Sequence, residues 1–372
     1  MGDYMERFIS HDEIFEMQKR NRQEIDFAHR VNAEVQEFGY FKSAKNDNVR
    51  MLYEMLYSYG QFVQYPYGVV AKQMQLSNYY RGERAYYGSS KATLHRNVPK
   101  DKIERLVYYF IENMRIGEFS VFLRKLDIIK NWKTSSINYD ALAQHYGLKT
   151  DYVDITNDFN VALFFACCKY NTISKKWEPL SKEDIQLKEN GSIDYRYGVL
   201  YRGESLSKDF LYRFGNQNPY NPVRPIGFQP LMRCHFQHAY TMQMNEDDDL
   251  YCDPRFEILK FEHSLELSDR IFQEMKQGEY IYPRYEIGLL DDCIERVKNT
   301  RIFSQQVFEN VFSWLFTFPY LKDYDTFSIN EIRDLLIERN IEIKDGYSVI
   351  DDKMVGDINE KCSEEMNFAE SV

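Results

Sequence analysis

The fold of this chain is decided by the stretch Tyr80-Arg81-Gly82-Glu83, followed at a distance by Ala143-Gln144-His145-Tyr146-Gly147-Leu148, Asp154, Thr156 and Ala162-Leu163-Phe164-Phe165-Ala166. The first motif is short and aromatic, and Gly82 allows a turn or a close approach, which predicts a strand that ends near Arg81. Residues 152–156 alternate apolar and polar side chains, which predicts a second strand with Asp154 and Thr156 on one face.

Helices are predicted between and around these strands. Asp101 and Glu104 have the spacing of a helix start, and Asp158 can cap a helix that contains residues 162–166. A short helix is predicted at residues 139–146, with Gly147 ending it. Further strands are expected at residues 198–201, 240–244 and 256–261. We therefore predict an α+β fold with a mixed central sheet flanked by helices and with helical segments at both ends.

The 372-residue chain is 44% hydrophobic and can bury a large core. We predict three segments: a helical N-terminal extension at residues 1–78, an α+β domain at residues 79–300, and a helical C-terminal segment with an acidic tail at residues 301–372. The extension is either packed on the core or a partner-binding arm. One face of a helix in it is formed by Val49, Leu52, Met55, Leu56 and Tyr59, with Gly60 just beyond the helix end.

Charge and composition exclude several classes of function. The net charge of -11 argues against a broad electrostatic surface for nucleic acid or anionic membrane, although it is compatible with a local basic pocket. The N-terminus lacks the apolar core of a signal peptide, and no apolar run is long enough to span a bilayer. The six cysteines form no Cys-x-x-Cys motif, which is typical of reduced thiols. We predict a cytoplasmic protein with no membrane partner and no metal.

The order of the motifs resembles the FRG domain, a family named after an aromatic-Arg-Gly triplet. The resemblance covers roughly residues 79 to 297 and includes Arg96, Arg233 and Gln237. The triplet is also similar to the first core strand of arginine-type ADP-ribosyltransferases, where it holds NAD. The later landmarks of those enzymes map onto Thr156, Phe165-Ala166 and the region of Gln237.

These resemblances imply an NAD-binding or nucleotide-binding site. They imply a catalytic set of Arg81, Asp154 and Gln237, and a ligand-binding set of Tyr80, Gly82, Gln144, His145, Thr156 and Arg233. A guanidinium beside a glycine suits a phosphate or carboxylate, because it presents a planar fork of charged donors. The transferases have a glutamate where this chain has Gln237, and an amide supplies no negative charge. Either Asp154 or another carboxylate replaces that glutamate, or the domain binds a nucleotide without transfer.

The function implied is that of a bacterial FRG-domain protein with ADP-ribosyltransferase-like or NAD-cleaving chemistry, as the toxic or effector part of a phage defence system. The acceptor, protein or nucleic acid, is left open. The alternative is a non-enzymatic ligand-binding or protein-interaction module, in which Arg81 is the buried salt-bridge partner of Asp154. We expect Arg81, Gln144, Asp154 and Gln237 to converge on one cleft.

Overall fold

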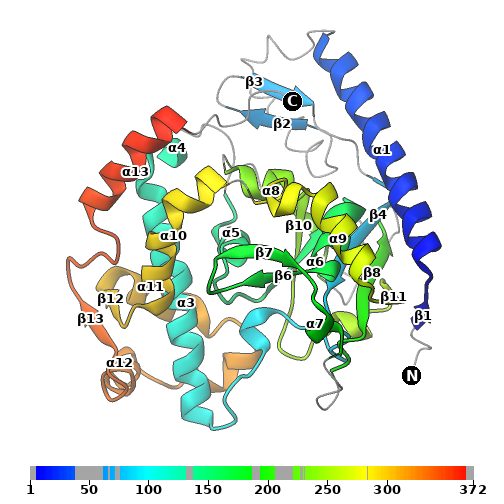
Figure 1. The fold of residues 1–372 in the computed structure, drawn as a ribbon. Helices are drawn as coiled ribbons and strands as arrows, with labels where there is room; N and C mark the ends of the chain where they lie inside the picture. The colour runs from blue at the N-terminus through cyan, green and yellow to red at the C-terminus, as the bar shows by residue number, and fades with distance from the viewer. Residues whose placement is uncertain are drawn as a thin grey trace.

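The computed structural model describes residues 6–37, 62–65, 68–71, 76–130, 137–186, 193–205, 221–226, 229, 231–282 and 284–365 (Figure 1). The predicted helix face from Val49 to Tyr59 lies outside the described residues. The predicted α+β class is confirmed, because a mixed sheet lies at the centre with helices around it.

The central sheet has seven strands in the order β1-β11-β8-β4-β5-β10-β9. Their bounds are β1 Glu6–Phe8, β4 Asn78–Glu83, β5 Tyr152–Thr156, β8 Tyr197–Glu204, β9 Arg224–Pro225, β10 Ala239–Gln243 and β11 Glu257–Glu262. All neighbours are antiparallel except β1 and β11, which makes the sheet mixed. Separate two-stranded sheets are formed by three further pairs of strands. These pairs are β2 Phe62–Tyr65 with β3 Gly68–Ala71, β6 Cys168–Asn171 with β7 Lys176–Pro179, and β12 Ile302–Ser304 with β13 Glu342–Lys344.

The sheet splits between its two central strands, β4 and β5. On one side, β4 pairs with β8 over its whole length, from Asn78 to Glu83. On the other side, the register with β5 joins only Tyr80 to Thr156. The second half of β4 therefore has an open edge facing β5, and this edge begins at Arg81.

One face of the split sheet is covered by α6 (Phe159–Cys167). The side chain of Asp158 accepts the amide hydrogen of Asn160, so the predicted cap is confirmed. Tyr80 packs edge-on against Phe159, with ring centroids 5.2 Å apart. Gly82 lies against the same helix, and a Cβ atom there would be 1.7 Å from the carbonyl oxygen of Ala162. The glycine of the triplet is thus explained by the approach of a helix to the sheet.

The remaining helices surround this centre (Figure 1). Their bounds are α1 His11–Glu37, α3 Lys102–Lys125, α4 Asp127–Lys130, α5 Tyr139–His145, α7 Lys182–Gln186, α8 Met232–Phe236, α9 Leu265–Glu274, α10 Arg284–Asn299, α11 Gln305–Leu315, α12 Ile329–Ile337 and α13 Asp352–Glu365. Short 3₁₀ turns occur at Thr93–His95, Leu250–Cys252, Lys276–Gly278 and Pro319–Tyr324. The predicted helix start at Asp101 is confirmed, since its side chain caps α3, and Ser328 caps α12 in the same way.

Both ends of the chain contact the centre. At the N-terminal end β1 extends the sheet beside β11, a strand that the sequence analysis did not predict. On α1, the side chain of Asn21 bonds the backbone at Asn157 and Phe159. At the C-terminal end α11 and α12 pack against α3 through apolar residues. The helix α13 includes Gly356 and continues to Glu365.

The first prediction concerns the packing of Gly82 on α6. Gly82→Ala should lower the free energy of unfolding by about 3 kcal/mol or more, because the added methyl group overlaps a helix carbonyl that has no room to move. Gly356→Ala is the matched control: nothing lies within 4 Å of its added Cβ, so a change of only about 0.5 to 1 kcal/mol, in the stabilising direction, is expected. Urea unfolding measures both, and equal stabilities would contradict this packing.

A second prediction concerns His95, which is buried between the hydroxyl of Tyr109 and the carbonyl oxygen of Met244. Burial lowers the pKa of His95 to about 4. The unfolded chain binds this proton more readily, so the stabilisation is complete above about pH 6.5 and is lost as the pH falls. From about pH 7 to about pH 4.5, this group should reduce the free energy of unfolding by about 2 to 3 kcal/mol. His95→Gln should remove that part of the pH dependence, and an unchanged slope would refute the assignment.

Candidate functional site

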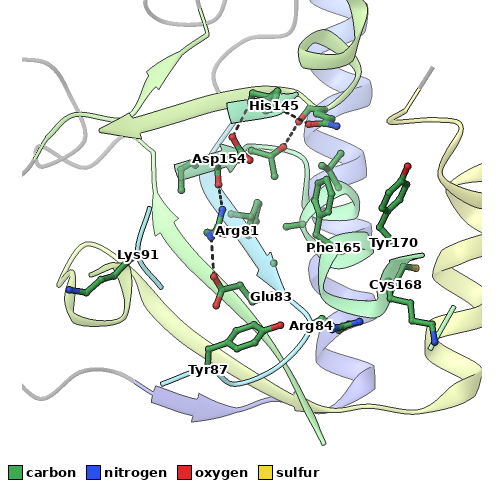
Figure 2. Close-up of a pocket in the computed structure, with 18 of the residues that line it drawn as sticks. Arg81, Glu83, Arg84, Tyr87, Lys91, His145, Asp154, Phe165, Cys168 and Tyr170 are labelled. Atoms are coloured by element: carbon green, nitrogen blue, oxygen red, sulfur yellow. Dashed lines mark hydrogen bonds and ion pairs between the residues drawn. The ribbon is translucent and has the colours of Figure 1, made fainter. Parts of the chain in front are cut away.

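A cavity of about 930 Å³ lies where β4 and β5 separate. Its lining comes from β4, β5, α6, the end of α5, the hairpin of β6 and β7, and the segments 84–97 and 237–239 (Figure 2). Successive side chains of β4 point to opposite faces of the sheet, and the lining includes residues from Tyr80 through Glu83. The cavity therefore follows the open edge of the strand and is bounded by residues from both faces.

Arg81 bridges the split in the sheet. One guanidinium nitrogen donates to the backbone carbonyl oxygen of Asp154 at 3.0 Å, and Nε donates to Glu83 Oε1 at 3.2 Å. The carboxylate of Glu83 also accepts bonds from Ser90 Oγ and from the Tyr201 hydroxyl. Glu83, not Asp154, is thus the carboxylate partner of Arg81, and the ion-pair alternative is realised with a different residue.

His145, Asp154 and Gln237 form a chain of polar contacts along the cavity wall (Figure 2). His145 Nδ1 lies 3.0 Å from Gln237 Oε1, and His145 Nε2 lies 3.2 Å from Asp154 Oδ1. The second pair is close but not aligned as a hydrogen bond. The side chain of His145 is 3% exposed, whereas that of Asp154 is 37% exposed. Among these three side chains, Asp154 is therefore the one that is most accessible to a ligand.

The other predicted residues take distinct positions. Gln144 lies behind the wall: its amide nitrogen donates to Asp154 Oδ2 at 3.5 Å, and its oxygen accepts from two threonine hydroxyls. Thr156 lines the cavity and donates to the backbone oxygen of Gln237. Tyr80 and Gly82 line it as well. Arg233 lies outside the lining, with its guanidinium 3.7 Å from the centre of the Tyr282 ring. The expected convergence holds for Arg81, Asp154 and Gln237, with Gln144 one contact away.

One part of the cavity is basic, although the chain as a whole has a net charge of -11. Its cationic lining residues are Arg81, Arg84, Lys91, Arg96 and Lys169, against the carboxylates Glu83 and Asp154. Arg96 is held by a bond from its Nε to the backbone oxygen of Lys91. Burial among the cavity walls, with Arg81 nearby, lowers the pKa of Arg96. An anion bound among these positive side chains reduces the repulsion between them.

An aromatic wall stands on the other side of Arg81 from Lys91, where Phe165 and Tyr170 are seen (Figure 2). Trp177 on β7 completes it, with ring centroids 5.5 Å from those of both Phe165 and Tyr170. Sequence reasoning missed Tyr170 and Trp177, because the hairpin that presents them was not predicted. The sequence signal for this hairpin was a pair of four-residue strands on either side of a turn, one with Tyr170 and the other with Trp177.

Two negative findings bear on the chemistry. Among the described residues, no group of three or more histidine, cysteine, aspartate or glutamate side chains is arranged to hold a metal ion. Within the same part of the chain, no helix has the length and apolar character needed to cross a bilayer.

Comparison with known families identifies part of the chain. Residues 77–175 match the FRG domain, and the chain contains an FRG domain at these residues. The match includes Arg81, His145, Asp154 and α6, whereas Gln237 lies beyond it. No curated protein matches the chain, and no solved structure does.

A third prediction tests the structural role of Arg81. Arg81→Ala leaves the carboxylate of Glu83, which is 7% exposed, without its cation, so the free energy of unfolding should fall by about 3 kcal/mol or more. Arg96→Gln is the control: neighbouring atoms surround Arg96 closely enough to lower its pKa, but its side chain is solvent-exposed and its bond to Lys91 is made on the surface of the cavity. Its effect should stay within about 0.5 kcal/mol. Thermal or urea unfolding of both variants decides, and an Arg81→Ala protein of normal stability would show that Arg81 is free to serve a ligand alone.

Proposed function

We propose that the FRG domain of this protein binds NAD, or a closely related nucleotide, in the cavity at the split of the sheet and cleaves its nicotinamide–ribose bond. The observation that supports this most is the pairing of a basic wall with an aromatic wall in one cavity, within a chain of net charge -11. A dinucleotide requires both features, since its phosphates are anionic and its rings are flat.

The size and charge of the cavity favour a ligand of this class. About 930 Å³ is within the range of sites for small molecules and cofactors. Arg96 and Lys91 lie at the basic part, and within the described part of the chain each bonds a backbone oxygen and forms no ion pair with a carboxylate. Arg81 has bonded part of its guanidinium to the protein, so it serves the ligand mainly by its charge. The pyrophosphate is assigned to this part, and one planar ring to Phe165 and Trp177.

Asp154 is the carboxylate that we assign to the chemistry. Cleavage of the bond between the nicotinamide nitrogen and C1′ of the ribose leaves positive charge on the sugar, which a nearby carboxylate stabilises. Glu83 is occupied by Arg81, Ser90 and Tyr201, whereas the side chain of Asp154 is open to the cavity. Gln237 is 4% exposed and bonds His145 and the backbone of Ile281, so we assign it a supporting role.

In the reaction, the electron pair of the broken bond leaves with nicotinamide, whose ring becomes neutral. A hydroxyl of water or of an acceptor forms the new bond to C1′ and gives up its proton. Water as acceptor gives NAD hydrolysis, and a protein or nucleic-acid acceptor gives ADP-ribosyl transfer. Consumption of NAD would make the protein toxic to a bacterial cell, in keeping with the role in phage defence that the resemblance implies.

A fourth prediction tests binding at the basic wall. Arg96→Gln should weaken NAD binding about 10-fold to 100-fold, because a charge-assisted contact to phosphate is lost. Lys353→Gln on α13 is the control, since it removes one positive charge from an exposed residue outside the cavity lining and should leave the dissociation constant unchanged. Isothermal titration calorimetry measures both. Equal losses in the two variants would mean that only overall charge matters.

A fifth prediction separates an enzyme from a binding module. The wild type should release nicotinamide from NAD, and Asp154→Asn should reduce the rate at least about 100-fold while NAD still binds. Liquid chromatography of the products measures release, and calorimetry measures binding. Binding of NAD with no release by the wild type would favour the non-enzymatic module, and absence of binding would reject NAD as the ligand.

A further inference from the structure

We propose that His145 Nε2 and Asp154 Oδ1 together form a site at the cavity wall that accepts one proton. Gln237 keeps Nε2 free of hydrogen, because it holds His145 in the tautomer with hydrogen on Nδ1. The use of this proton in catalysis rests on the proposed function, whereas the tautomer and the site can be tested without any ligand.

The orientation of the Gln237 amide is fixed by its second contact. Its nitrogen lies 3.1 Å from the backbone oxygen of Ile281, which can only accept a hydrogen bond. The amide oxygen therefore faces His145 Nδ1 at 3.0 Å, and an amide oxygen can also only accept. Nδ1 must donate, and so it carries the hydrogen.

With the hydrogen on Nδ1, the neutral imidazole has a lone pair on Nε2. That atom lies 3.2 Å from Asp154 Oδ1, which also carries lone pairs. Both atoms are buried, and neither has a hydrogen-bond partner among the described residues. Two buried acceptors at this distance repel each other, and a proton on His145 Nε2 replaces the repulsion by the attraction of an ion pair. Together, these two atoms form a site that accepts one proton.

The groups around His145 keep its Nε2 unprotonated at neutral pH. Burial lowers the pKa of His145, Asp154 raises it, and Arg233 lowers it again. Asp154 is in turn bonded by Gln144 at Oδ2 and by Arg81 at its backbone oxygen. These charged and polar groups come from α5, β5, α8 and β4, and they leave His145 neutral and able to take a proton.

The site supplies a destination for the proton released in the proposed reaction. As the nucleophilic hydroxyl forms its bond to C1′, its proton passes to Asp154 at Oδ2, because Oδ1 is buried. The loss of the negative charge on the carboxylate then relieves the repulsion between Oδ1 and His145 Nε2. Asp154 is the catalytic residue, because both residues line the cavity but the side chain of Asp154 is 37% exposed and that of His145 only 3%. His145 and Gln237 are positioning residues, which act through Asp154.

The test is to observe the ring nitrogens of His145 directly in the full-length protein without ligand. The chain has seven histidines, so labelling with ¹⁵N-histidine gives a simple long-range ¹H–¹⁵N spectrum, and the His145→Gln variant identifies the signals of His145. At about pH 8, the wild type should carry hydrogen on Nδ1 only, and on acidification Nε2 should gain the second proton. Hydrogen on Nε2 at that pH would overturn the proposal.

Two variants sharpen the result. Gln237→Leu removes the acceptor for Nδ1, so the hydrogen should move to Nε2, where it faces Asp154. Asp154→Asn removes the carboxylate, so Nε2 should be protonated only at lower pH than in the wild type. An unchanged tautomer in a folded Gln237→Leu protein would contradict the role of Gln237. If either variant fails to fold, the wild-type spectrum alone decides.

A kinetic measurement then connects the site to catalysis. Gln237→Leu should alter the pH dependence of nicotinamide release, and Lys353→Gln, at an exposed residue of α13 outside the cavity lining, should keep the wild-type profile. The same profile in Gln237→Leu and the wild type would reject the catalytic use of the proton. Absence of nicotinamide release in every protein would reject the proposed function and leave the tautomer result standing.

Discussion

The bond from the Arg81 guanidinium to the backbone oxygen of Asp154 is the interaction on which the site depends. Beyond the pair of Tyr80 and Thr156, β4 and β5 no longer share a ladder, and unpaired backbone groups inside a protein are costly. Arg81 satisfies one of them with a side chain, while Glu83 balances its charge. The split can thus stay open as a cavity without exposing the core to a destabilising loss of hydrogen bonds.

The same arrangement reconciles an acidic chain with a site for an anion. A net charge of -11 repels polyanions at long range, but screening limits that effect to about 10 Å at ordinary ionic strength. Inside the cavity, Arg96 and Lys91 act at contact distance, which is shorter than the screening length. This favours a small anionic ligand that can enter the cavity over a long nucleic acid that must follow the surface.

The sequence predicts the parts of this site that local patterns determine. Alternation identified β5 and the shared face of Asp154 and Thr156, and the cap at Asp158 fixed the start of α6. The choice of Glu83 as the partner of Arg81 could not be predicted, because it depends on β4 leaving β5 after one residue pair. The hairpin with Tyr170 and Trp177 was missed for a different reason, because its two strands are only four residues long and directly follow α6. Local periodicity carries no information on such long-range packing.

The central claim is that the split in the sheet is the ligand site, and a crystal structure with NAD or a non-cleavable analogue tests it most directly. The account predicts the pyrophosphate beside Arg96 and Lys91, a planar ring against Phe165 or Trp177, and Asp154 close to C1′ of the nicotinamide ribose. A ligand bound elsewhere, or a cavity that holds only water at saturating ligand, would contradict it.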